Sequence, residues 1–441
     1  MQVISCERSS SHVEVGQLKY YIGQTVKIHG IVYKIREMSG FAFVILRTKR
    51  DLLQCVYSEA FSRFSLSKLS DNMSVVVTGE VISDERSRTG IEVRLLEFEC
   101  LSEPLQEVPV VINNKKVDAS IETLLDYRPI TLRNAKERAI FQIQAGICRG
   151  FRQFFDENEF TEIRSPKIVF SGAEGGANIF KLDYFGKEAY LAQSPQFYKQ
   201  IMVGIFERVY EIGPVFRAEK HDTSRHVNEY TSVDIEMGFI RNFYDIMRLE
   251  TKMLAETMDF LREYYADELA LWKVDVPVIT EIPAIAFTEA KEMVAKTYQR
   301  DITDFEDFEP EEERLLCDIM QKQTGCDFVF VTHYKSSKRP FYAMDSKENP
   351  DVTESFDLLF RGVEITTGGQ RIHDYGQQIA KMERRGMCTE AFSSYLMAHL
   401  YGLPPHGGFG LGLERFTARL FNFQNVRYAT MFPRDIGRLE P

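Results

Sequence analysis

The pattern of the sequence changes abruptly about one hundred residues from its start. Before that point, short runs of β-branched and aromatic residues alternate with turn residues, as in residues 26–35, 41–46 and 52–57. From Asn134 onward, apolar residues recur at helical spacing, most clearly over residues 136–157. Runs of the first kind predict strands, and spacing of three to four residues predicts amphipathic helices. A chain of 441 residues with this contrast is expected to form at least two structural units.

The N-terminal region, residues 1–102, is expected to form a small β-barrel. Residues 74–81 and 91–98 add two more apolar runs, which brings the expected strands to five, and residues 59–69 predict a helix-like insert. Five short strands in a segment of this length fit an OB-fold, whose exposed sheet face often binds oligonucleotides. We therefore predict an OB-fold barrel that contacts nucleic acid.

The remainder predicts a linker over residues 103–133 and a larger α+β domain over residues 134–441. The linker contains Pro104, Pro109 and a polar run at residues 113–116. The helix at 136–157 leads into a short strand over residues 160–166, which a proline ends. Further strands are expected at residues 189–192, 208–212, 232–237, 328–332 and 356–360. Together they predict one large, mostly antiparallel sheet flanked by helices.

Composition excludes several classes of protein. No stretch reaches the roughly 18 uninterrupted apolar residues of a membrane span, and the start lacks a signal-peptide pattern. The seven cysteines are odd in number and have no metal-ligand spacing, which argues against a disulfide scaffold and a cysteine metal site. A net charge of −11 argues against a generic nucleic-acid coat, although a local basic face would still bind RNA. We expect a cytoplasmic protein with no membrane partner.

Two arginines far apart in the chain indicate nucleotide chemistry. Arg217 lies in the segment 210–219, and Arg415 follows the glycine-rich stretch 407–412, where backbone can approach a ligand closely. The two common phosphate-binding loops, GxxxxGK(S/T) and GxGxxG opening a βαβ unit, are absent. A guanidinium group is the alternative, because its fork of donors matches phosphate oxygens and it never loses its charge.

The residues around Arg217 extend this candidate phosphate site. Arg217 and Glu219 alternate along an expected strand, so both would point at one ligand. Arg225 and His226 would reach the distal phosphates, and Tyr230 offers a ring on which a purine can stack. Taken alone, this stretch fits a surface ladder of ion pairs equally well; the second arginine, Arg415, favours a binding site.

Two acidic residues and two basic residues complete the candidate site. Asp357 and Glu364 offer hard oxygen ligands for Mg²⁺ bridging phosphates, although single acidic residues in strands are more often structural. Lys199 and Arg371 would together bind a small carboxylate, the first as a point charge and the second by its fork. The pocket would be completed by Gln196 and Asp234.

These segments resemble a known family. Residues 136–157 with Pro166, residues 216–219 with Arg225 and His226, and residues 410–415 are similar, in order and spacing, to motifs 1, 2 and 3 of class II aminoacyl-tRNA synthetases. Within that class, residues 193–200, 368–374 and 432–438 resemble aspartyl-tRNA synthetases of the archaeal and eukaryotic type. The resemblance covers nearly the whole chain, including the N-terminal barrel.

The resemblance implies roles for individual residues. It assigns ATP to Arg217, Glu219, Arg225, His226, Tyr230, Glu364 and Arg415, of which Arg217, Glu219 and Arg415 would be catalytic. It assigns Mg²⁺ to Asp357 and Glu364. It assigns L-aspartate to Glu174, Gln196, Lys199, Asp234, Thr367 and Arg371, with residues 171–177 as a mobile loop. It assigns anticodon bases to Phe43 and Gln54, although Phe43 would also fit the barrel core. It further implies a homodimer through motif 1.

The function implied is aspartate–tRNA ligase activity: aspartate is activated with ATP and transferred to tRNA(Asp). Enzymes of this type that also charge tRNA(Asn) lack a tryptophan at the position of Ile31, whereas Arg86 keeps a basic residue at a second position linked to tRNA choice. These two positions disagree, and Ile31 favours relaxed choice. The alternatives are an asparaginyl-tRNA synthetase, a synthetase-like paralogue that charges no tRNA, and an inactive RNA-binding scaffold.

Overall fold

The computed structural model describes residues 12–49, 51–85, 87, 90–170, 178–220, 223–300 and 307–440. It divides into two compact units, Met1–Asp118 and Ala119–Pro441. The division falls inside the segment that the sequence marks as a linker. Part of that segment is helical, since α1 (Ile121–Asp126) and α2 (Arg128–Thr131) open the second unit.

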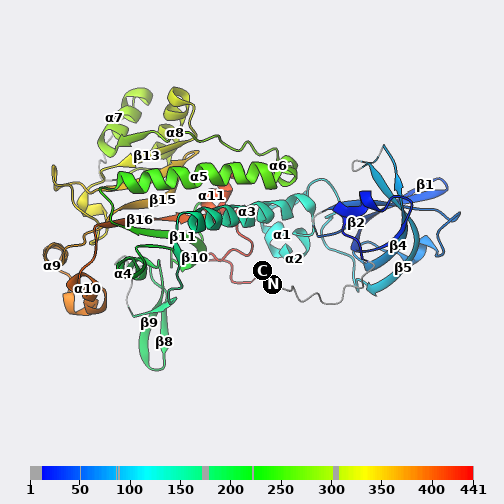
Figure 1. Ribbon diagram of the computed structural model, residues 1–441, viewed down its shortest axis with the longest axis horizontal. Coiled ribbons are helices and arrows are strands. Elements are labelled where there is room, and N and C mark those ends of the chain that lie inside the picture. The colour runs from blue at the N-terminus through cyan, green and yellow to red at the C-terminus, as the bar shows by residue number, and fades with distance from the viewer. Residues whose placement is uncertain are drawn as a thin grey trace. The chain divides into compact units, whose positions relative to one another are not determined.

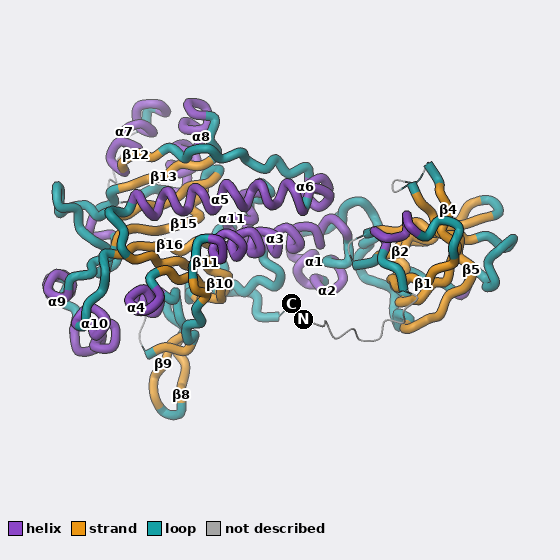
Figure 2. The backbone as a smooth tube through the Cα atoms, viewed as in Figure 1, coloured by secondary structure: helices purple, strands orange, loops and turns teal. Residues whose placement is uncertain are grey.

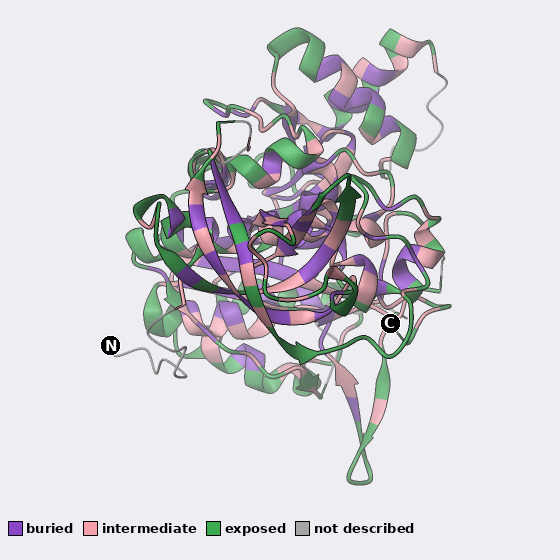
Figure 3. Cartoon of the chain, turned by 90° about the vertical axis from the view of Figure 1, so that its right-hand side faces the viewer, coloured by how far each residue is buried: buried purple, intermediate pink, exposed green. Residues whose placement is uncertain are grey.

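The first unit is a closed five-stranded barrel in the order β1-β2-β3-β5-β4, which confirms the predicted OB-fold. Its strands are β1 (Thr25–Met38), β2 (Phe41–Arg47), β3 (Leu52–Tyr57), β4 (Ser74–Ser83) and β5 (Ile91–Ser102). Burial alternates clearly along β2 and β3, as the pleat requires. In β2, Ala42, Val44 and Leu46 point into the core, and the residues between them point outward. Figure 3 shows these alternating bands.

The helix-like insert predicted at residues 59–69 is wrong. The structure has only turns and the short 3-10 helix η2 (Leu66–Lys68) there. Side chains tie this segment to the barrel: the Ser62 hydroxyl donates to the carbonyl of Leu95 (2.6 Å), and the Tyr57 hydroxyl donates to the carbonyl of Phe64 (3.0 Å). Serine hydroxyls that bond to backbone compete with helix formation.

The second unit is built on an eight-stranded sheet in the order β12-β13-β14-β15-β16-β11-β10-β6. Its strands are β6 (Thr161–Glu162), β10 (Arg208–Phe216), β11 (Glu229–Gly238), β12 (Ala284–Ala286), β13 (Phe328–Thr332), β14 (Ser355–Phe360), β15 (Val363–Gln370) and β16 (His406–Gly412). Only the outermost pairs, β12 with β13 and β10 with β6, are parallel, so the mostly antiparallel sheet is confirmed. The strand expected over residues 160–166 shrinks to two residues.

Two long helices cover one face of this sheet. They are α3 (Ala135–Glu157), close to the predicted 136–157, and α5 (Tyr244–Tyr264), and they run side by side in Figure 1. Asn134 caps α3, where its side chain accepts from the backbone N–H of Lys136 (2.9 Å). The apolar faces of both helices join Val233 and Ile235 of β11 in the main core. Because strand side chains alternate, Asp234 and Glu236 of β11 point to the opposite face.

The remaining helices are α4 (Gln196–Phe206), α6 (Ala266–Trp272), α7 (Phe287–Tyr298), α8 (Pro310–Thr324), α9 (Tyr375–Arg384), α10 (Ser393–Leu400) and α11 (Leu413–Leu420). Of these, α6 and α11 contact α3 and contribute to the main core, and the others lie elsewhere around the sheet. A three-stranded sheet contains β7 (Ile168–Val169), β8 (Lys181–Tyr184) and β9 (Lys187–Leu191), and Figure 2 shows β8 and β9 as a projecting hairpin. None of the helices in the described ranges has the length and apolar character needed to cross a membrane.

One buried acid opposes the stability of the second unit. Glu250 lies in the middle of α5 with no exposed surface and faces Thr366 of β15. Burial raises the pKa of its carboxyl group to about 8, and Thr366 offsets this only in part. The folded chain therefore holds a proton on Glu250 that the unfolded chain releases above its ordinary pKa of 4.5.

We predict that Glu250→Gln stabilises the protein at neutral and basic pH. The folded-state pKa is raised, so the wild-type chain keeps its full stability below about pH 4.5 and loses it as the pH rises towards about 8. The glutamine variant lacks this loss, so its advantage should grow by about 1.4 kcal/mol per pH unit across that window. Urea unfolding at several pH values measures the difference. The control is Glu256→Gln, a partly exposed glutamate of the same helix, and a pH-independent difference for Glu250→Gln contradicts the account.

Candidate active site

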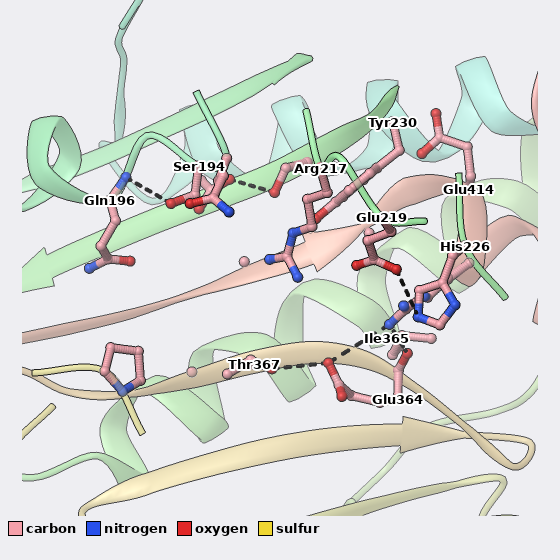
Figure 4. A pocket seen from close by; sticks show the side chains of 18 of the residues that line it. Ser194, Gln196, Arg217, Glu219, His226, Tyr230, Glu364, Ile365, Thr367 and Glu414 are labelled. Carbon is pink, nitrogen blue, oxygen red and sulfur yellow. Dashed lines mark hydrogen bonds and ion pairs between the residues drawn. The ribbon is translucent and has the colours of Figure 1, made fainter. Parts of the chain in front are cut away.

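A cavity of about 240 Å³ opens on the face of the eight-stranded sheet that carries Asp234. It brings together residues from α4, β11, β15 and α11 and from the segment between β10 and β11. Of the residues singled out from the sequence, the lining contains Gln196, Lys199, Arg217, Glu219, Arg225, His226, Tyr230, Asp234, Glu364, Thr367, Arg371 and Arg415. Figure 4 shows several of them converging from segments far apart in the chain.

The sequence predicts Arg217 and Glu219 on a strand, but both lie beyond its end. Strand β10 ends at Phe216, so strand alternation does not orient these two side chains. Asn228 does so instead: its side-chain amide donates to the carbonyls of Arg217 (2.8 Å) and Glu219 (3.1 Å). Its own carbonyl accepts from the N–H of Arg217 (2.9 Å). Both side chains still line the cavity, and the Arg217 guanidinium lies 5.9 Å from the ring of Tyr230.

His226 sits among cations. Its Nε2 lies 3.5 Å from Glu219, and its Nδ1 lies 2.6 Å from the Thr223 hydroxyl. Burial lowers the pKa of His226, the charge of Arg415 lowers it further, and Glu219 opposes the change. Arg225 and Arg217 also lower this pKa, and three cations around one half-buried ring suit a polyanion.

Arg225 is held by groups outside the predicted set, and Arg415 by the backbone carbonyls of two predicted residues. Arg225 is paired with the carboxylate of Glu313, on α8, and donates to the carbonyl of Gly362 (3.3 Å). Arg415 donates from Nε to the carbonyl of Arg225 (3.2 Å) and from Nη1 to the carbonyl of Glu364 (3.3 Å). Glu313 is the last of three consecutive glutamates at the start of a helix. From the sequence alone, such a run is typical of a solvated helix end, so Glu313 was not predicted.

The predicted metal ligands lie beside each other. Asp357 of β14 is outside the cavity lining but pairs in register with Thr367 of β15, whose hydroxyl donates to Glu364 (3.0 Å; Figure 4). One Asp357 oxygen is bound by Arg339 (2.6 Å), and Oδ1 is buried without a hydrogen-bond partner among the described residues. Burial raises the pKa of Asp357, Arg339 opposes this, and Glu364 adds to it. An orphaned carboxylate oxygen beside a second carboxylate fits a hard divalent cation such as Mg²⁺.

The other end of the cavity contains a buried cluster of four charges. Lys199 of α4 is 1% exposed and donates to Asp234 (2.8 Å) and to the carbonyl of Phe409 (2.9 Å). Arg371 binds Glu236 through Nε (3.1 Å) and the carbonyl of Gly408 through Nη2 (2.9 Å). Glu236 also lies 3.7 Å from the Lys199 ammonium, so it links the two cations.

The cluster is electrically balanced before any ligand binds, with two cations and two carboxylates. Burial lowers the pKa of the Arg371 guanidinium, but Glu236, Tyr342 and Tyr395 together raise it by more. Glu236 was missed from the sequence, although its alternation with Asp234 along a strand is the signal that finds it. Nη1 of Arg371 makes no hydrogen bond within the described ranges and remains for a ligand.

The glycine-rich stretch forms strand β16, and its Gly410 and Gly412 line the cavity. Its glycines also have a second role that was not predicted. Gly408 pairs with Glu236 and Gly410 pairs with Asp234 on the neighbouring strand. A Cβ at Gly408 would overlap the Glu236 carboxylate, and one at Gly410 would lie 3.1 Å from an Asp234 oxygen. These glycines therefore make room for the buried carboxylates.

A neutral hydrogen-bond network supports the cluster from behind. The side-chain amide of Gln196 donates to Gln200 (2.9 Å), and the amide nitrogen of Gln200 lies 3.0 Å from Nε2 of His406. Because an amide nitrogen only donates, Nε2 accepts, and Nδ1 carries the proton that it donates to the carbonyl of Pro404 (2.8 Å). Burial lowers the pKa of His406 to about 4, so this ring is neutral near pH 7.

Comparison with known proteins identifies the family. Residues 120–436 match the class II tRNA synthetases (D, K and N), and residues 26–101 match the OB-fold nucleic acid binding domain. The chain belongs to the class II tRNA synthetases. Its barrel and its cavity-bearing sheet are therefore the two domains of a synthetase of this group, and the resemblance noted from the sequence is confirmed.

Relatives of this synthetase include ligases with two kinds of name. The chain is 46% identical to the aspartate–tRNA(Asp/Asn) ligase of Deinococcus radiodurans (96% of this chain, 98% of the relative) and 44% identical to that of Thermus thermophilus (97% and 100%). It is 37% identical to the aspartate–tRNA(Asp) ligase of Pyrococcus furiosus (95% and 97%). Among solved structures, the asparaginyl-tRNA synthetase of Pyrococcus horikoshii with asparaginyl-adenylate is similar (TM-score 0.89, 29% identity, 97% and 99% coverage).

The remaining predicted residues of the synthetase lie elsewhere. Glu174 of the predicted mobile loop and Arg86 lie outside the described residues. In the barrel, Phe43 is half-buried on the outward side of β2, where it contacts the ring of Phe41 (centroids 5.2 Å apart), and it is not part of the barrel core. Gln54 is half-buried and donates to the buried Glu92.

Ile31 is half-buried on β1, where it pairs in register with Ser74 of β4 and with Arg47 of β2. These three barrel positions, Ile31, Phe43 and Gln54, are separate from the cavity, and their roles stay predictions.

We predict that Gly408→Ala destabilises the synthetase by about 3 kcal/mol or more, because the added Cβ overlaps the carbonyl of Ile235 and displaces Glu236. Denaturant unfolding of the whole chain measures the change. Gly437→Ala is the matched control, since its Cβ would meet only an Asp435 oxygen at 3.6 Å. A Gly408→Ala variant as stable as this control would show that β16 does not need its glycines.

Proposed function

We propose that this chain is an aspartate–tRNA ligase that activates L-aspartate with ATP and transfers it to tRNA(Asp) and also to tRNA(Asn). The proposal depends on two buried cations, Lys199 and Arg371, that lie together at one end of the cavity. Both side chains line the cavity, and Nη1 of Arg371 makes no hydrogen bond within the described ranges, although Asp234 and Glu236 already neutralise the two charges. A ligand that brings its own carboxylate side chain adds the acceptor that these donors lack.

Charge distinguishes aspartate from asparagine in this pocket. A carboxylate accepts from both Lys199 and Arg371 through its two oxygens. An asparagine amide has one accepting oxygen. Its NH₂ group only donates, so it would face the donors of Lys199 or Arg371 in a site without water. Unpaired buried donors of this kind cost about 1–3 kcal/mol, and more where a charge is involved. Gln196, Asp234, Thr367 and Glu174 are proposed to contact the remaining polar groups of the amino acid.

ATP is proposed to occupy the arginine-rich end. Arg217 would contact the α-phosphate, Arg225 and His226 the distal phosphates, and Tyr230 with Arg415 the adenine ring. The α-carboxylate of aspartate attacks the α-phosphorus, and pyrophosphate leaves. A hydroxyl of the terminal adenosine of tRNA then attacks the aspartyl carbonyl of the mixed anhydride, and AMP leaves with the ester formed. The protein supplies position and preorganised charge, with no nucleophile of its own.

Mg²⁺ is proposed to bind at Asp357 and Glu364. The buried, unpartnered oxygen of Asp357 beside Glu364 supports this assignment. When bound, the ion would neutralise charge on the phosphates. Glu219 would hold the nearby His226 in place, since the two lie 3.5 Å apart.

The barrel is proposed to bind the anticodon. The outward position of Phe43 supports stacking on a base, which contributes about 1–3 kcal/mol per base. Gln54 would read a base edge, after exchange of its bond to Glu92. Relaxed tRNA choice is supported by Ile31 and by the names of the two relatives above 40% identity.

A homodimer through α3 and Pro166 is also proposed. Next to the exposed Pro166, Ile168 is 48% and Phe170 is 78% exposed, which supplies apolar surface for a partner. We place the enzyme in the cytoplasm, consistent with the free thiols of the six described cysteines.

Pyrophosphate exchange tests the amino-acid assignment. Aspartate should support ATP–pyrophosphate exchange, and asparagine at equal concentration should support less than about one hundredth of that rate. The likeness to a solved asparaginyl-tRNA synthetase makes asparagine the relevant competitor. Exchange driven by asparagine and not by aspartate would replace the proposal with that function, and no exchange with either would leave a binding scaffold.

Charging of two purified tRNAs tests the tRNA assignment. The wild-type enzyme should aspartylate both tRNA(Asp) and tRNA(Asn). Ile31→Trp, which introduces the bulky residue of selective enzymes, should lower charging of tRNA(Asn) by about tenfold and leave tRNA(Asp) charging within about twofold, because one added clash costs about 1–2 kcal/mol. A wild-type enzyme that leaves tRNA(Asn) uncharged contradicts relaxed choice.

A further inference from the structure

Arg225 is gripped at one nitrogen by groups from two distant segments. Its Nη2 is bound by the carboxylate of Glu313, from α8, and donates to the carbonyl of Gly362 (3.3 Å). Within the described ranges, Nε and Nη1 of Arg225 make no hydrogen bond, while the residue lines the cavity. One edge of the guanidinium is therefore held by protein, and the other two nitrogens remain for a ligand.

Glu313 is fixed because the start of α8 is fixed. Its neighbour Glu312 accepts from the backbone N–H of Glu309 (2.8 Å), as part of a capping box between these two residues. Glu312 also accepts from the buried Lys291 ammonium (2.7 Å). Pro310 occupies the first turn of the helix, where its ring favours the helical conformation. The Glu313 side chain is only 13% exposed, so the carboxylate has little freedom to leave Arg225 for solvent.

The helix that carries Glu313 has a core of its own. Helices α7 and α8 pack with β12 and β13 in an apolar cluster separate from the main core, and they lie together in Figure 1. The residues of this cluster include Phe287, Val294, Leu316 and Val331. Helix α8 thus contacts the cavity-lining Arg225 through the carboxylate of Glu313.

We propose that Glu313 is a positioning residue for the distal phosphates: it holds Arg225 by Nη2 so that Nε and Nη1 face the β- and γ-phosphates of ATP or the phosphates of pyrophosphate. This inference rests on the proposed function. A free arginine side chain must lose rotamer freedom when it binds phosphate, and a guanidinium already held at one nitrogen loses less. Nη2 then bonds to two protein acceptors, and the donors on Nε and Nη1 are left for phosphate oxygens.

Kinetics of Glu313→Gln test the proposal in aspartate-dependent ATP–pyrophosphate exchange. The KM values for pyrophosphate and ATP should rise by about tenfold, because a charge-assisted hydrogen bond is lost. The KM for aspartate and the inhibition constant of AMP, which has no distal phosphate, should stay within about twofold. A general structural defect would move all four constants together.

Two controls accompany this variant. Glu311→Gln removes the same charge from the same helical turn, but Glu311 is exposed and pairs with Arg300 (2.7 Å), so its constants should match the wild type. In an Arg225→Gln background, Glu313→Gln should change the KM for pyrophosphate no further, since its effect acts through Arg225. If Glu313→Gln fails to fold, Glu313→Asp, whose carboxylate falls short of Arg225, replaces it with the same expected pattern.

Several results would overturn the proposal. An unchanged KM for pyrophosphate in Glu313→Gln would show that Arg225 does not need its partner, and a lowered KM would show that Glu313 competes with the phosphates. Additive effects of the two substitutions would exclude action through Arg225. Each of these outcomes leaves the proposed function intact if the wild type shows aspartate-dependent exchange, whereas a wild type without such exchange removes both.

Discussion

The four buried charges of Lys199, Asp234, Glu236 and Arg371 constrain the rest of the catalytic unit. Removing charges from water costs several kcal/mol for each ion, and this cost is offset only when every charge is paired and hydrogen-bonded. Side-chain alternation along β11 places both carboxylates on one face of the sheet. The glycines of β16 leave room for these carboxylates, and α4 carries the Lys199 ammonium. The sheet architecture and the charge cluster therefore depend on each other.

The opposite end of the cavity contains arginines from separate segments of the chain. In the proposed function they bind one polyphosphate, although the chain has neither of the two common phosphate-binding loops. Each is oriented by a partner from elsewhere: Asn228 binds the backbone at Arg217, Glu313 binds Arg225, and Arg415 donates to the backbone at Glu364. These arginines also lower the pKa of His226, in addition to the larger effect of burial. The proposed polyphosphate site thus depends on tertiary contacts and not on a local motif.

Local patterns in the sequence predicted most of the fold and most of the cavity lining. The five barrel strands and the helix at 136–157 were predicted because alternation and helical periodicity are strong over these lengths. The insert at 59–69 was mistaken for helix because its serines bond to barrel backbone, a contact that no local pattern reveals. Arg217 and Glu219 were placed on a strand that ends one residue earlier, yet they reach the cavity because Asn228 holds them.

Residues that act through another residue were the hardest to predict. Glu236 is detectable by its spacing from Asp234, whereas Glu313 is not, because its role depends on how a separate helical element packs against the sheet. The glycines of β16 were predicted to let the backbone approach a ligand. Their fit against Asp234 and Glu236 was not predicted, because a sequence cannot show which neighbouring side chain fills the space that a glycine leaves.

A crystal structure of the enzyme with a non-hydrolysable aspartyl-adenylate analogue tests the central claim most directly. The account predicts the side-chain carboxylate within hydrogen-bond distance, about 3 Å, of both the Lys199 ammonium and the Arg371 guanidinium. It also predicts that Asp234 and Glu236 keep their present partners. A carboxylate bound elsewhere in the cavity, with Lys199 and Arg371 paired only to each other's carboxylates, would contradict it.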